Sequence, residues 1–124
     1  MNKQRPINVY LLTYKYPVTA IISVLHRVSG AFVFLLIPLL LWMLASSLAS
    51  PQQFDELQGM LGNPMMKLIL WLFLSALLYH LVAGIRHLAM DFGVGESLNS
   101  ACRSAWAVAI IAAILILLTG IWLW

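Results

Sequence analysis

The sequence predicts an all-α integral membrane protein whose three transmembrane helices form an up-down-up bundle. Of its 124 residues, 63% are hydrophobic and only 9% are charged, whereas about a quarter of the residues of a soluble domain are charged. The charges gather in short stretches between three apolar runs, each long enough to cross a bilayer as a helix. We therefore expect a single membrane domain, residues 1–124. The net charge of +3 is interpreted as a topology signal, and no nucleic-acid partner is expected.

The first span is expected at about residues 18–48. The residues before it are basic and aromatic and contain no acid, which is typical of a membrane–water interface: Lys3, Arg5, Tyr10, Tyr14, Lys15 and Tyr16. Pro17 suits the start of a helix, where its missing N–H does no harm. Pro38 lies inside the span and is the position at which we expect a kink. The run is longer than a signal-peptide core, so we expect it to be retained.

Two further spans follow. Residues 50–64 contain Pro, Gly, Asn and two acids and are expected to form the first connection. The second span is expected at about 65–91, ended by the glycines of residues 93–95. The third is expected at about 101–124, with Trp122 and Trp124 anchoring it at an interface.

The basic residues predict the orientation. Six of the seven Lys and Arg residues lie in the N-terminal part or beside the second connection, and only Lys67 lies at the first. Because Lys and Arg accumulate on the cytoplasmic side, we expect a cytoplasmic N-terminus and a C-terminus on the opposite side.

The second span carries ionisable residues, which are costly at membrane depth and mark a functional site by default. On a helix, His80, Gly84, His87 and Asp91 share one face. Gly84, one turn from His80, would clear that face for a flat, bulky group, and the combination suggests a porphyrin site. His80 follows Lys67 by 13 positions, so it should lie about 20 Å into the membrane at 1.5 Å per residue.

A second polar face lies on the first span, where Ser23, His26, Arg27 and Gly30 follow helical spacing. Counting along the helices places His26 about 10 Å shallower than His80. We therefore expect a polar pocket near the cytoplasmic surface, with one deeper histidine below it.

These residues also have structural interpretations. His80 could simply hydrogen-bond a neighbouring helix, and Gly84 could serve close helix packing. Ser23 could bond the carbonyl four residues earlier. Basic side chains near a span's end, those of His26 and Arg27, could extend to the lipid headgroups. For Arg86, a position that marks where the second span leaves the membrane is the preferred interpretation.

Two motifs resemble the signatures of a known family. Ser23-Val24-Leu25-His26-Arg27-Val28-Ser29-Gly30, preceded by Arg5-Pro6 and Tyr14-Lys15-Tyr16-Pro17, resembles that of the cytochrome b subunit of bacterial succinate dehydrogenase. His80-x-x-x-Gly84-Ile85-Arg86-His87-Leu88-x-x-Asp91 matches a second signature of the same family. The resemblance covers essentially the whole chain in its length and in its number of membrane spans. The residues that identify the family specifically lie at 5–30 and 79–91. It departs after Arg5-Pro6, where many members have Ser-Pro-His and this chain has Ile7-Asn8-Val9.

The resemblance implies a haem b-binding anchor subunit of succinate:ubiquinone oxidoreductase in the bacterial inner membrane, active in the respiratory chain and citric acid cycle. Its implied partners are a second three-helix anchor subunit, an iron–sulfur subunit and a flavoprotein subunit. His80 corresponds to one axial ligand of the haem iron, and the second anchor supplies the other. Ser23 and Arg27 correspond to ubiquinone-site residues. The expected haem environment, including the propionates, comprises His26, Arg27, Gly84 and His87.

No residue of this chain is expected to be catalytic on its own. Three alternatives remain open: the anchor of a fumarate reductase, an anchor that has lost haem, and a small proton- or ion-conducting subunit. The absence of a carboxylate between Glu56 and Asp91 counts against a proton relay.

Overall fold

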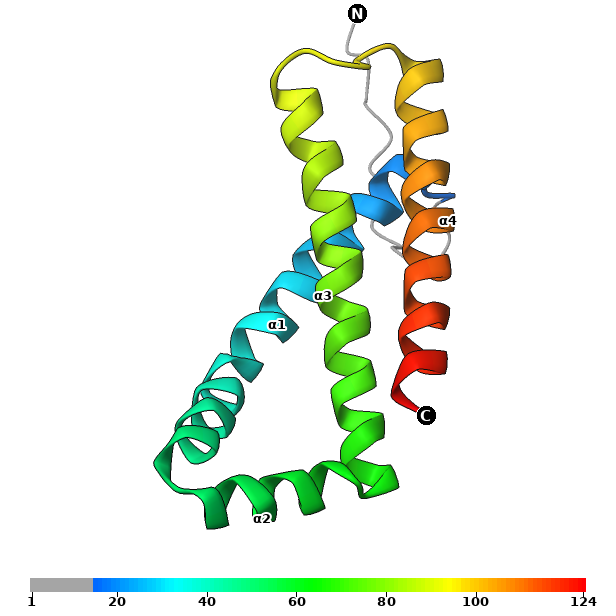
Figure 1. Ribbon diagram of the computed structural model, residues 1–124. Coiled ribbons are helices and arrows are strands. Elements are labelled where there is room, and N and C mark those ends of the chain that lie inside the picture. The colour runs from blue at the N-terminus through cyan, green and yellow to red at the C-terminus, as the bar shows by residue number, and fades with distance from the viewer. Residues whose placement is uncertain (1–14) are drawn as a thin grey trace, which may run out of the picture.

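The computed structural model describes residues 15–124, which form four helices. Three are long, α1 (Val18–Ala49), α3 (Pro64–Asp91) and α4 (Leu98–Leu123), and α2 (Pro51–Leu61) is short. Successive long helices run in opposite directions (Figure 1), which confirms the predicted all-α, up-down-up arrangement. The predictions for residues 1–14, including the departure at Ile7-Asn8-Val9, lie outside the described residues.

The helix ends follow from local capping. The Asn63 side chain accepts a hydrogen bond from the Met65 amide at 2.9 Å and so caps α3, because the first amides of a helix lack backbone partners. In the same way Ser97 caps α4, accepting from the Ser100 amide at 3.4 Å. This cap starts α4 three residues before the expected 101. Pro38 lies inside α1 without ending it.

The expected connection at 50–64 is largely helical, which the sequence analysis did not predict. Ser50 caps α2 by accepting from the Gln53 amide at 3.1 Å, and Pro51 occupies the first turn. Proline is well tolerated there, since its missing N–H would have no helical partner. A residue interpreted as a helix breaker therefore begins a helix.

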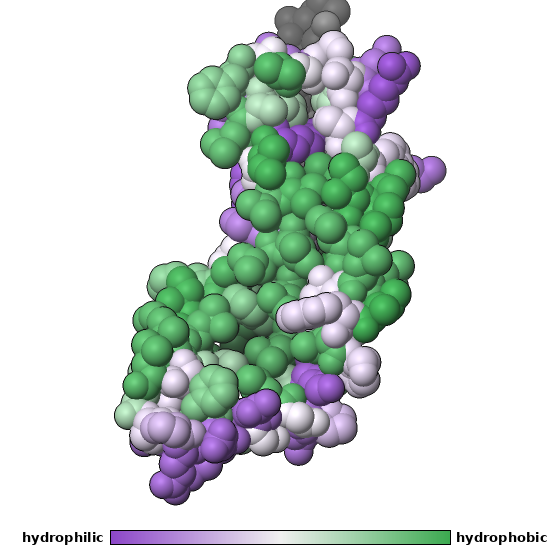
Figure 2. Space-filling model, in the orientation of Figure 1, coloured by the Kyte–Doolittle hydropathy of each residue, from purple (hydrophilic) through white to green (hydrophobic). Residues whose placement is uncertain are grey.

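The long helices have the length and apolarity to cross a membrane. Figure 2 shows a broad hydrophobic belt above a hydrophilic lower end, with hydrophilic and apolar groups mixed at the upper end. Large apolar side chains are exposed throughout α1, α3 and α4, with Leu35 at 71% and Ile121 at 77% exposure. In a multi-pass membrane protein such side chains face lipid or a partner.

The helices pack unevenly. α3 and α4 lie side by side, whereas α1 meets α3 near its N-terminal end and then diverges, and α2 joins the far ends (Figure 1). The compact core is small and comprises Ile22, Ala83, Ala105 and Val108. Small alanines let the three helices approach closely at this level. The candidate site residues lie beside this core.

Candidate functional site

Three histidine rings stack where α1 crosses α3. The ring of His26 lies 4.1 Å from that of His80 and 4.7 Å from that of His87, measured between centroids, with interplanar angles of 10° and 18°. The two α3 histidines are seven residues apart, and the α1 histidine contacts both. The expectation that His26 lies about 10 Å shallower than His80 is therefore wrong. Counting along each helix assumed parallel axes, but α1 runs obliquely to α3 (Figure 1).

His80 is fixed to α1 through one ring nitrogen. Its Nδ1 lies 3.0 Å from the carbonyl oxygen of His26 and 3.3 Å from Ser29 Oγ. A carbonyl oxygen only accepts, so Nδ1 carries the proton and donates. The Nε2 atom is then unprotonated and able to bind a metal, an arrangement common among metal-binding histidines.

Gly30 makes this approach possible. A Cβ atom at this position would lie 2.7 Å from Cε1 of His80, closer than non-bonded carbon atoms approach. The sequence analysis placed Gly30 on the polar face but gave it no role. The sequence could not reveal this role, since nothing in it indicates that residue 30 lies next to residue 80.

Gly84 was expected to clear space for a porphyrin, and the flat group that the structure places beside it is the His26 ring. A Cβ at Gly84 would lie 3.2 Å from His26 Nε2. That nitrogen is buried and has no hydrogen-bond partner among residues 15–124. Because buried polar atoms are nearly always paired, the unpaired atom points to a partner from outside the described residues.

Ser23 joins the stack through His87. The Nδ1 atom of His87 lies 2.8 Å from the Ala83 carbonyl oxygen, so it donates there. The Nε2 atom lies 3.4 Å from Ser23 Oγ and accepts from that hydroxyl. Beside them Tyr79 donates from its hydroxyl to the Ile22 carbonyl at 3.0 Å. The bonds of Ser23 and Tyr79, together with the bond from His80 to the α1 backbone, therefore tie α1 to α3 at one level.

A cavity of about 480 Å³ opens next to Ser23 and His87. It is enclosed by the first turns of α1, the last turns of α3 and the start of α4, and its polar lining residues are Thr19, Ser23, Arg86, His87, Asp91 and Glu96. Its size falls within the usual range for small-molecule sites. Arg27 is exposed and does not line this cavity, so of the two predicted ubiquinone residues only Ser23 does.

Arg86 is buried, with 8% of its surface exposed. Its Nε donates to Ser104 Oγ at 2.9 Å and its Nη2 to the Ala101 carbonyl at 3.1 Å. The side chain thus holds the start of α4 against α3. Nothing in the sequence indicated this contact with α4. The interpretation of Arg86 as a residue that marks where the second span leaves the membrane stays a prediction.

The donor set suits a haem better than a bare metal ion. Within the described part of the chain, no group of three His, Cys, Asp or Glu residues could hold a metal. The stacked imidazoles present faces to one another, so their in-plane lone pairs do not converge. A porphyrin would bring four nitrogen donors of its own, and the oriented Nε2 of His80 could then serve as a ligand to its iron.

Comparisons with known proteins agree with this interpretation. The family described as succinate dehydrogenase/fumarate reductase transmembrane subunit matches residues 1–119. A Coxiella burnetii protein named succinate dehydrogenase cytochrome b556 subunit is 45% identical, with both chains covered completely. Proteins of the same name from Paracoccus denitrificans and Rickettsia typhi are 33% and 32% identical, over 93% of this chain and 88% and 90% of theirs.

Proposed function

The chain belongs to the succinate dehydrogenase/fumarate reductase transmembrane subunit family, and we propose that it binds haem b and forms part of the site where succinate dehydrogenase reduces ubiquinone. Its three apolar helices make it the multi-pass membrane subunit of that enzyme. The observation that carries the proposal is the tether of His80 Nδ1 to α1, which leaves Nε2 able to bind iron.

His80 supplies one axial ligand in this proposal. The haem, when bound, supplies a one-electron iron centre whose potential depends on its ligands, hydrogen bonds and burial. The bond from Nδ1 to the His26 carbonyl keeps the His80 ring from rotating and raises the basicity of Nε2. His26 and His87 contact each other face to face rather than offering lone pairs to a common point. In this proposal a second ligand to the iron would come from a partner subunit.

His26 and Arg27 are suited to the carboxylates of the haem propionates. The buried Nε2 of His26 has no partner among the described residues and can donate when it carries a proton. Arg27, the next residue, brings a permanent positive charge at the surface of α1. Charge-assisted bonds to carboxylates are among the stronger hydrogen bonds.

Ser23 and Arg27 act on the ubiquinone head group. Reduction places negative charge on a carbonyl oxygen, and a positioned hydroxyl and a nearby cation stabilise that charge as it develops. The Ser23 hydroxyl lines the cavity and lies beside His87. Arg27 is one helical turn further along α1 and outside the cavity lining, so its part in the proposal rests on the family signature and on its permanent charge.

The proposed assembly contains a second three-helix anchor, an iron–sulfur subunit and a flavoprotein subunit. The exposed apolar side chains of α1, including Val24 at 56% and Val28 at 59%, offer the second anchor a surface beside the histidines. The excess of basic residues at the histidine end supports a bacterial inner-membrane location with a cytoplasmic N-terminus. The soluble subunits then dock at that end.

Visible spectra test the proposal. The purified complex should show the sharp bands of a low-spin, six-coordinate haem, and succinate should change them as the iron is reduced. The isolated chain reconstituted with haem should not form a six-coordinate species, since it supplies one axial ligand. A low-spin bis-histidine spectrum from the isolated chain would contradict the shared site. A purified complex without haem absorbance would contradict the proposal as a whole.

A further inference from the structure

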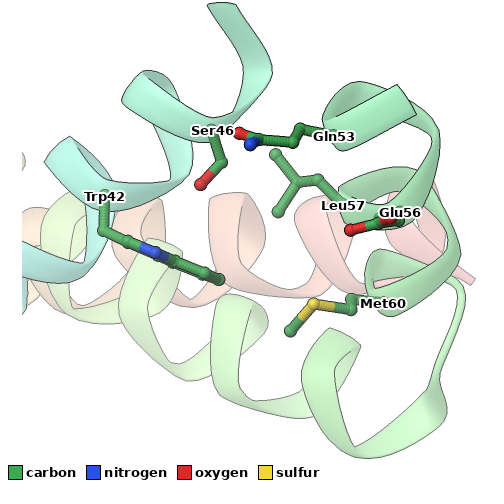
Figure 3. Close-up of a pocket in the computed structure, with 6 residues that line it drawn as sticks. All are labelled: Trp42, Ser46, Gln53, Glu56, Leu57 and Met60. Atoms are coloured by element: carbon green, nitrogen blue, oxygen red, sulfur yellow. The ribbon is translucent and has the colours of Figure 1, made fainter. Parts of the chain in front are cut away.

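A second pocket lies at the opposite end of the molecule from the histidines, where the last turns of α1 meet α2. Its volume is about 270 Å³. Figure 3 shows side chains from both helices directed into the same space. The lining residues are Trp42, Ser46, Gln53, Glu56, Leu57 and Met60. Neither the haem nor the ubiquinone proposal uses any of them.

The polar side of this pocket consists of groups that can accept hydrogen bonds. Glu56 Oε1 accepts from Gln52 Nε2 at 3.2 Å, and no cation within residues 15–124 forms an ion pair with that carboxylate. In the same part of the chain, the side chains of Ser46 and Gln53 form no hydrogen bond. A carboxylate, a hydroxyl and an amide therefore surround one small space, and no positively charged side chain among the described residues lines it.

The other side of the pocket is apolar. The indole of Trp42 faces the space from α1, and Leu57 and Met60 face it from α2 (Figure 3). Leu57 is the buried residue of α2, at 8% exposure, so the pocket continues into the contact between the two helices. An aromatic ring opposite a carboxylate is a favourable setting for a cation, which is attracted to the face of the ring.

The pocket lies at a membrane surface. α2 crosses between the far ends of α1 and α3 (Figure 1), and this end of the molecule is hydrophilic below the apolar belt (Figure 2). An amphipathic helix in this position lies in the plane of the lipid headgroups. A ligand of the pocket therefore comes from the headgroup layer.

We propose that this pocket binds the ammonium group of a phospholipid, with phosphatidylethanolamine as the fitting lipid. Its ammonium N–H groups donate to Glu56 and Ser46, and its charge lies against the Trp42 ring. Leu57 and Met60 contact the apolar part of the lipid that follows. A volume of about 270 Å³ lies just below the range of about 300–1,000 Å³ that is usual for small-molecule sites, which suits a small headgroup.

The proposal predicts selectivity among lipids. A primary ammonium donates three hydrogen bonds, whereas a trimethylammonium can use only its charge, and a glycerol headgroup brings no positive charge. Retention should therefore decrease from phosphatidylethanolamine to phosphatidylcholine to phosphatidylglycerol.

Native mass spectrometry of the purified complex, equilibrated with equal amounts of these three lipids, tests the site. Glu56→Gln keeps the shape and removes the charge, and bound phosphatidylethanolamine should fall about threefold, within the range of an exposed ion pair. The matched control is Asp55→Asn, which removes the same charge from the neighbouring residue outside the pocket and should leave retention unchanged. Succinate oxidation with a soluble dye confirms that each variant complex is assembled.

A second pair of variants tests the contribution of the Trp42 ring to lipid binding. Trp42→Leu should also lower phosphatidylethanolamine retention, whereas Trp106→Leu should not, because Trp106 lies on α4 at 60% exposure and outside the pocket. Equal retention of the three lipids by the wild-type complex would overturn the proposal. So would equal losses in Glu56→Gln and Asp55→Asn, which would indicate general surface charge, or unchanged retention in both Glu56→Gln and Trp42→Leu.

Discussion

The two ends of this membrane subunit are built in different ways. At the histidine end, three helices meet around small alanines, and side chains of α3 bond to α1 and α4 (Figure 1). At the α2 end, α1 and α3 stand apart, and Leu57 is the buried residue of the short helix between them. In that half of the described chain, the one side-chain hydrogen bond between α3 and α4 joins Trp71 Nε1 to the Ile116 carbonyl at 3.0 Å.

This difference indicates which end of the molecule is held in place by contacts within the chain itself. The histidine end holds polar groups in place through contacts within the chain, so its candidate haem ligand is oriented before any partner binds. The α2 end leaves apolar and acceptor groups for lipid or another subunit. Substitutions should therefore have large effects at the first end and small effects at the second.

Replacing Arg86 should give the largest loss of stability. Arg86→Met keeps the length of the side chain but removes two bonds from a charged donor, each worth about 1.5–3 kcal/mol. We expect a clearly lower midpoint for thermal loss of haem absorbance in the complex. Arg103→Met is the matched control, since Arg103 is exposed and such changes stay within about 0.5 kcal/mol. Equal midpoints for the two variants would show that the α3–α4 tether contributes little.

A glycine-to-alanine substitution, which adds one methyl group, should have opposite effects at the two ends. Gly30→Ala places a Cβ 2.7 Å from the His80 ring, and overpacking of this kind costs about 1–3 kcal/mol. Haem retention during purification should fall at least about fivefold. Gly59→Ala in α2 meets nothing within 4 Å and should keep haem, with a gain of up to about 1 kcal/mol in helix stability. Full haem retention in Gly30→Ala would show that His80 has room to move.

Changes at the proposed ubiquinone residues should have smaller and more specific effects. Arg27→Ala removes a positive charge and should reduce ubiquinone reductase activity more than Ser23→Ala. The serine change removes a hydrogen bond worth about 0.5–1.5 kcal/mol, which corresponds to roughly two- to tenfold. Dye reductase activity should stay unchanged in both complexes, because the proposed flavoprotein subunit would carry that chemistry. Normal ubiquinone kinetics in both variants would show that these residues do not act on ubiquinone and would favour a role at the membrane interface.

The sequence predicted the long helices well because their apolar runs are long and clearly bounded, and α1 and α3 begin and end within a residue of the expected positions. The start of α4 differs by three residues because the Ser97 cap decides it. It missed α2 because Pro51 and the nearby glycines were interpreted as breaks, although a proline after a capping serine starts a helix.

Within the site, the motifs singled out His80 and Ser23, and the structure places both at the α1–α3 crossing. The contact between His26 and His80, the need for glycine at position 30 and the direction of Arg86 were beyond sequence reasoning. Each depends on how two helices cross, and the spacing of residues along one helix carries no information about that angle. The roles of these residues toward haem and ubiquinone remain predictions.

The central claim is that His80, alone in this chain, binds the haem iron. Electron paramagnetic resonance and visible spectra of complexes carrying His26→Ala, His80→Ala or His87→Ala test it most directly. We predict that only His80→Ala abolishes the low-spin six-coordinate signal, whereas the other two keep it with a shifted reduction potential. A low-spin signal that survives His80→Ala, or that disappears as completely in His26→Ala or His87→Ala, would contradict this assignment.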